Sequence, residues 1–197
     1  MSTAWGERST PLCLPKNANA RGMREERRRR SGSMKNKPEA FTDDGYIINQ
    51  PHIDGGRGER RRFRRDGAGI AAYNFLHALG REACWPSLYE ALRRSRPGLS
   101  PGTSPRRLFR SLRRQDLPGL AKAAGRKRAL ALLADAPRAG ILLYRHKSGL
   151  HYVAFRPEGE GTYRFFNAMP GNARHIERME DFLKTHARAW PVFLIKA

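Results

Sequence analysis

The run from Asp66 to Gly80 constrains the fold of this chain most strongly, because it has the pattern of a helix with both ends marked. Asp66 is a residue type that caps a first helical turn, and Gly80 is one that ends a last turn. Between them the side chains are apolar on most sides of a helix. Such a helix must be covered on most sides, so we expect it to lie buried at the centre of the fold with an exposed N-terminus.

The first turn of this helix consists of the small residues Gly67, Ala68 and Gly69, which allow other backbone or a substrate to approach closely. The N-terminus of a helix carries unpaired N–H groups and about half a positive charge. These features stabilise a thiolate or an oxyanion placed there. The first turn is therefore where a nucleophilic cysteine would be expected.

This run resembles the start of the central helix in papain-like cysteine peptidases, where Gly-Cys-Gly is followed by alanine, asparagine and leucine. It is most similar to the bacterial group that includes the double-glycine leader peptidases of bacteriocin exporters. In this chain Ala68 occupies the cysteine position. The resemblance covers about residues 60–197 and implies a papain-like hydrolase fold, a peptide or leader-peptide substrate, and a catalytic order of Cys, then His, then Asn or Asp.

His151 and Asn167 follow Ala68 in that order, each in a similar local motif, Gly-Leu-His-Tyr-Val and Phe-Phe-Asn-Ala. If residues 150–156 and 162–168 form a hairpin, symmetric pairing about Gly159 places His151 opposite Asn167, with Cβ atoms about 5 Å apart. An amide facing an imidazole holds it in one tautomer, as a general base requires. We therefore expect the sheet to present both side chains toward Ala68.

Two departures from the family bear on activity. A methyl group cannot act as a nucleophile, so covalent thiol catalysis is excluded at Ala68. The family usually has a glutamine about six residues before the cysteine to complete the oxyanion hole, and Arg62 stands there. The resemblance then leaves Arg62 and Gly67 as the oxyanion contacts. Ala68 is either a laboratory substitution in an active peptidase or the natural residue of a pseudoenzyme that binds peptides.

The remaining pattern is that of an α+β protein, because helices come first and strands second. We expect an antiparallel sheet of about four or five strands, and residues 41–50 contain a turn and a short apolar segment able to dock as an edge strand. We expect the other strands at 141–144, 150–155, 163–168 and 192–195, and helices at 87–94, from 105 onward, 126–134 and 177–186.

Charge supports an alternative function. The net charge is +21 and the isoelectric point is near 11.3, and clustered Arg and Lys bind nucleic acid by releasing counterions from its phosphates. The run Tyr163-Arg164-Phe165-Phe166, in which an arginine lies among aromatic residues, suggests base stacking on the sheet. The cluster from Arg60 to Arg65 is a candidate contact for an anionic partner. An excess of arginine on solvated faces is the simpler explanation of the same charge.

Cys13 and Cys84 are too few for a disulfide framework and lack metal-ligand spacing, which fits a reducing cytoplasm. Cys84 lies just beyond Gly80, about 20 Å from the start of the central helix, so it does not replace the missing nucleophile. No signal-peptide pattern or membrane span is present in the sequence. Glycine motifs for nucleotides are also absent, and we expect no metal or other cofactor.

Residues 1–40 are rich in Ser, Pro, Asn and Arg and have no apolar periodicity, so we expect a disordered basic tail before a single domain at 41–197. Met34, followed by Lys-Asn-Lys-Pro, is an alternative start site.

A chain that starts at Lys35 is expected to fold as cooperatively as the full chain, because the tail buries too little apolar surface to offset the entropy of ordering it. Thermal unfolding followed by circular dichroism checks this expectation. Loss of cooperativity, or a midpoint several degrees lower, would contradict it.

Overall fold

The computed structural model describes residues 41–48, 67–83, 88, 91–92, 103–135, 137–146, 149–166, 175–187 and 189–197. All of them belong to one compact unit, Pro38–Ala197. The expected tail at 1–40 lies outside the described residues, as do Arg62, Asn167, Cys13 and Cys84.

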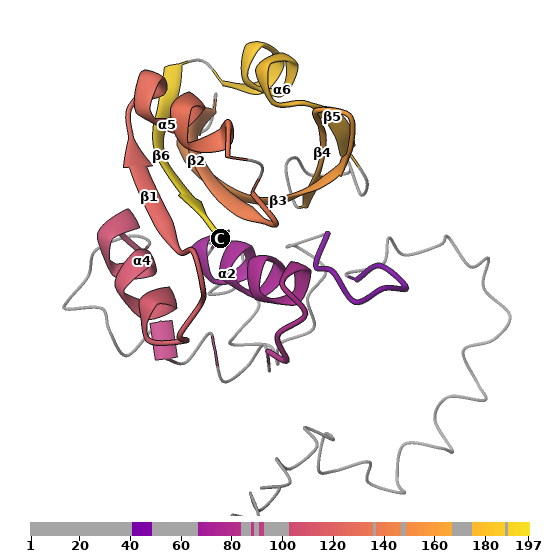
Figure 1. Ribbon diagram of the computed structural model, residues 1–197, viewed down its shortest axis with the longest axis vertical. Coiled ribbons are helices and arrows are strands. Elements are labelled where there is room, and N and C mark those ends of the chain that lie inside the picture. The colour runs from indigo at the N-terminus through magenta and orange to yellow at the C-terminus, as the bar shows by residue number, and fades with distance from the viewer. Residues whose placement is uncertain are drawn as a thin grey trace, which may run out of the picture. The chain divides into compact units, whose positions relative to one another are not determined.

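The described residues form a six-stranded sheet in the order β1-β6-β2-β3-β4-β5, with antiparallel pairing throughout (Figure 1). The strands are β1 Ala121–Ala124, β2 Gly140–His146, β3 Gly149–Gly159, β4 Thr162–Phe166, β5 His175–Arg178 and β6 Ala189–Lys196. The α+β class is confirmed. The expected count of four or five strands is wrong.

The two strands missing from the sequence-based list have weak local signals. β1 reads Ala-Lys-Ala-Ala, which are helix-forming residues, yet it is a strand because it pairs with β6 through contacts such as Ala123 with Leu194. β5 occupies the place where the last helix was expected to begin, and it pairs with β4. In both cases pairing with a neighbouring strand overrides local propensity.

The helices are α2 Gly67–Ala78, α4 Pro105–Arg113, α5 Arg126–Leu133 and α6 Met179–His186. α2 ends as expected, since Gly80 adopts a φ of 69° that suits glycine. The hydroxyl of Ser104 accepts a hydrogen bond from the N–H of Arg107 and so caps α4. Of the helix expected at 87–94, only Leu88, Ala91 and Leu92 are described, and they are helical.

The sheet is covered on both faces (Figure 1). On one face Ile141, Ala154 and Phe166 pack in a core with α2 and α4. On the other face the alternate residues, such as Leu142 and Val153, pack in a second core with α5 and α6. This division follows from the period of two along a strand.

α2 is buried along most of its length, as its apolar surface predicted. Its Asn74 is fully buried and binds both backbone groups of Ile47: the side-chain oxygen accepts from the N–H at 2.8 Å, and the side-chain amide donates to the C=O at 2.8 Å. These bonds dock residues 41–48 on α2. The turn expected in this segment is present at residues 43–44, and the described residues pair through a single bridge between Phe41 and Ile47 rather than as an edge strand.

Asn74→Ala is expected to lower the free energy of unfolding by about 2–5 kcal/mol, because it leaves the two buried backbone groups of Ile47 unsatisfied. Urea denaturation measures the change. Gln115→Ala is the matched control, since it removes an amide from an exposed position and should stay within about 0.5 kcal/mol. Equal effects of the two substitutions would contradict the structural role of Asn74.

Candidate functional site

The start of α2 lies against the start of β3. A Cβ atom placed on Gly67 would be 3.8 Å from Nδ1 of His151 and 3.9 Å from the backbone nitrogen of Tyr152. These are ordinary van der Waals distances. The structure therefore brings the ring of His151 to the first residue of α2, directly before Ala68.

The imidazole of His151 is positioned by aromatic neighbours. Tyr144 pairs with His151 across β2 and β3, and their rings meet edge to face with centroids 5.7 Å apart. Tyr144 in turn packs edge to face on Phe182 of α6 at 5.4 Å, and Phe182 stacks on Phe165 at 3.9 Å. This series of contacts runs from α6 to the ring that faces α2.

His151 lies on a different face of the sheet from the one we expected. Because side chains alternate along β3, His151 shares the α6 face with Val153 and Phe155 rather than the α2 face. It still reaches the first residue of α2, because the start of that helix lies against the start of β3.

Ala68 and Gly67 have different surroundings. Ala68 is 1% exposed and packs in the core with Ala71, Ala72 and Phe75. Gly67 is partly exposed and faces His151. Successive residues of a helix point about 100° apart, so these neighbours present different sides of the first turn. The sequence alone does not separate the two positions, because both lie in one run of small residues.

The hairpin of β3 and β4 is present, but its predicted register is wrong. Symmetric pairing about Gly159 would place Ala154 opposite Arg164, whereas Ala154 pairs with Phe166. The chain reverses at Glu160 and Gly161, which both have positive φ, as a tight hairpin turn requires, and a bulge follows Pro157. The alignment of His151 with Asn167 rested on the rejected register, and Asn167 lies outside the described residues.

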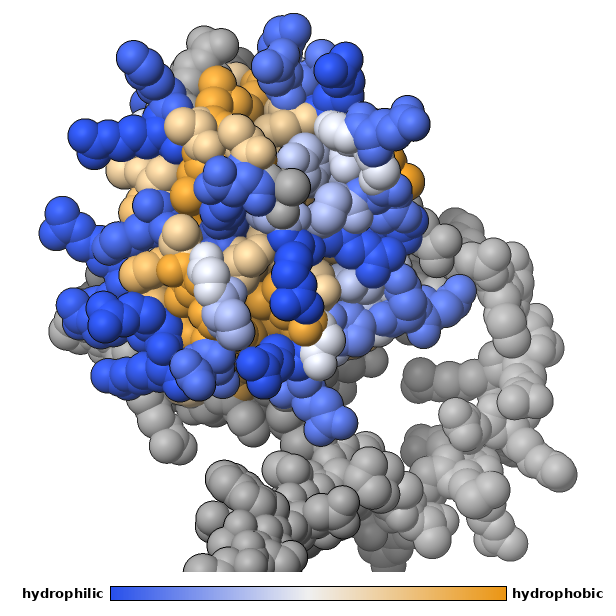
Figure 2. Space-filling view, in the orientation of Figure 1, coloured by the Kyte–Doolittle hydropathy of each residue, from blue (hydrophilic) through white to orange (hydrophobic). Residues whose placement is uncertain are grey.

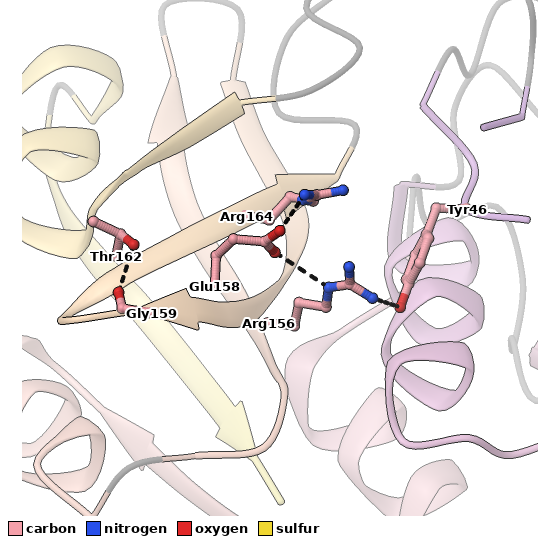
Figure 3. Close-up of polar contacts among 6 residues, drawn as sticks. All are labelled: Tyr46, Arg156, Glu158, Gly159, Thr162 and Arg164. Carbon is pink, nitrogen blue, oxygen red and sulfur yellow. Dashed lines mark hydrogen bonds and ion pairs between the residues drawn. The ribbon is translucent and has the colours of Figure 1, made fainter. Parts of the chain in front are cut away.

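A polar cluster next to α2 fixes residues 41–48 to the hairpin (Figure 3). Tyr46 stacks on Phe166 with ring centroids 3.9 Å apart, and its hydroxyl accepts a hydrogen bond from Arg156 at 2.8 Å. Glu158 accepts from both Arg156 and Arg164. The docking of residues 41–48 thus uses α2 on one side and the hairpin on the other.

This cluster also corrects the proposed stacking surface on the sheet. Phe165 and Phe166 are 0% and 2% exposed, and Arg164 is bonded to Glu158. Base stacking on these aromatic residues is therefore wrong. One signal in the sequence was the presence of two successive phenylalanines in a strand. Successive side chains point to opposite faces, so Phe165 and Phe166 are both core residues when the sheet is covered on both faces.

The chain matches no model of a known protein family, no curated protein and no solved structure. Among the described helices, none is long and apolar enough to cross a membrane. Within the same residues, His, Cys, Asp and Glu side chains do not gather in groups of three or more that would hold a metal ion.

Burial raises the pKa of Tyr144, so the native state resists losing the phenol proton. Above about pH 10 the unfolded state releases this proton while the native state keeps it, and stability should fall with rising pH. Tyr144→Phe is expected to make this alkaline loss shallower, by up to about 1.4 kcal/mol per pH unit. Urea denaturation between pH 8 and pH 11 measures the slope.

Phe182→Leu provides the control for this measurement, because it weakens the packing around Tyr144 without removing a titrating group. It should lower stability by the same amount at each pH. If Tyr144→Phe leaves the slope of stability against pH unchanged, the pKa of Tyr144 does not differ between the native and unfolded states.

Proposed function

We propose that this chain is a papain-like, cysteine-peptidase-like domain that lacks its nucleophile and binds peptides at the start of α2. The observation that supports this proposal is the position of the His151 ring, 3.8 Å from a Cβ atom placed on Gly67, the first residue of α2. The same two elements carry the cysteine and histidine positions of the family that the sequence resembles.

The chemistry of these groups suits a peptide. The first N–H groups of a helix have no partner within the helix, so they can donate to a peptide carbonyl or carboxylate. The imidazole of His151 can donate or accept a proton beside the same atom. With a methyl group at Ala68 the bound peptide is held without attack by a thiolate.

The proposal predicts that Ala68→Cys produces a reactive thiol. The helix N-terminus favours the thiolate, and His151 can accept its proton. The thiol pKa should then lie well below the value of about 8.5 for a free cysteine. Iodoacetamide at pH 6 should label residue 68 at least ten times faster than Cys13 or Cys84, as followed by mass spectrometry.

Two further variants make this test specific. His151→Ala in the Ala68→Cys chain should slow the labelling, whereas His146→Ala, which removes an imidazole from the end of β2, should not. Gly67→Cys places the thiol on the side of the turn that faces His151. If only the thiol at residue 67 responds to His151→Ala, the match between Ala68 and the family cysteine is wrong.

Peptide binding itself is tested by protection. A peptide that ends in Gly-Gly, the substrate feature that the resemblance implies, should slow the labelling of Ala68→Cys. The same peptide ending in two bulky residues serves as the control. A thiol that titrates like a free cysteine and ignores both His151→Ala and the peptides would reject the proposed function.

A further inference from the structure

Positive charge is unevenly distributed in this domain. Residues 104–138, which contain α4, β1 and α5, include ten Arg or Lys and two Asp or Glu, a net charge of +8. Residues 149–187, which contain β3, β4, β5 and α6, include five of each and have no net charge. A uniform excess of arginine on solvated faces would not produce this contrast.

The basic side contains an open groove between α4 and β1, with a volume of about 520 Å³. Its lining residues are Arg106, Phe109, Arg110, Arg113, Arg114 and Lys122. A second hollow of about 590 Å³ shares Arg106 and Lys122, and continues along β1 to Arg128 of α5 and to Phe193. In Figure 2 hydrophilic side chains project from the side where Figure 1 places α4 and β1, with apolar surface between them.

Three of the four arginines of α4 share one side of the helix. Arg106, Arg110 and Arg113 are spaced by four and three residues, so they follow one another along the same face. Leu108 and Leu112 lie on the opposite side and are buried in the core, which fixes the orientation of α4. The arginine face is therefore held toward the solvent by the packing of the helix.

These cations are available to a ligand. Within the part of the chain that the structure describes, the arginines of the groove and Lys122 form no ion pair. Asp135, the acidic residue that lines the second hollow, is bonded to Lys196 at 3.0 Å. Guanidinium groups bind phosphate with two parallel hydrogen bonds, so a row of arginines on one face suits a chain of phosphates.

The groove also contains aromatic surface. Phe109 is partly buried, and the ammonium group of Lys122 lies 4.6 Å from the centre of its ring. Phe193 lines the neighbouring hollow. An acidic peptide would neutralise the arginines and leave these rings without a specific partner, whereas nucleobases stack on them.

From this arrangement we infer that the groove formed by α4, β1 and α5 binds single-stranded nucleic acid, with phosphates on the arginines of α4 and bases against Phe109 and Phe193. The site is separate from the start of α2, and the inference does not depend on the proposed peptide binding.

The test uses the full chain and a fluorescein-labelled 15-nucleotide oligothymidine in an anisotropy titration at several salt concentrations. Arg110→Gln combined with Arg113→Gln removes two charges from the groove. Arg178→Gln combined with Lys184→Gln removes two charges from exposed positions at α6, and is the matched control.

The groove variant should bind about tenfold or more weakly at 0.1 M salt, and its slope of log affinity against log salt should be shallower by about 1.4. The α6 variant should change the affinity less than twofold. Phe109→Leu keeps apolar packing but removes the ring, so it should weaken binding at least fivefold without changing the slope.

Photocrosslinking locates the bound strand. An oligonucleotide carrying 4-thiothymidine should crosslink to peptides that contain α4 and β1. Crosslinks confined to residues 1–66, or equal weakening by the two charge variants, would overturn the inference. The inference would also be overturned if Phe109→Leu had no effect and polyglutamate displaced the labelled strand as efficiently as unlabelled oligonucleotide did. That result would assign the groove to an acidic peptide.

Discussion

The rest of this structure depends on the burial of α2. A helix with apolar residues on most of its surface is stable in water only when other elements cover it. Here β3 and its neighbours cover one side, while α4 and residues 41–48 contribute to the same core. Asn74 lies within this apolar environment. Its burial is tolerated because its side-chain amide forms hydrogen bonds with both the N–H and the C=O of Ile47.

The position of α2 decides what surrounds its first turn. Because the helix packs along β3, its first residue comes to the ring of His151. That ring packs against Tyr144, which in turn packs against Phe182 of α6. The candidate site thus joins the two cores at the start of β3, and its geometry depends on the packing of both.

The arginines of this domain fall into two kinds with different roles. Arg156 and Arg164 are bonded to Glu158 and help to hold residues 41–48 in place. Arg106, Arg110 and Arg113 stand on the exposed face of α4 without an ion-pair partner among the described residues. Net charge therefore does not measure binding capacity, because part of it is used within the fold.

The sequence by itself determined the elements with strong local signals: α2, the Ser104 cap of α4, the helix at 126–133 and the central strands. Only the tertiary structure decided that Ala-Lys-Ala-Ala is an edge strand, that the hairpin register is shifted by two residues, and that His151 contacts position 67. The physical reason is the distance along the chain over which each kind of interaction acts. Caps, breakers and periodicity act within a few residues, whereas strand pairing and helix docking depend on partners far away in the chain.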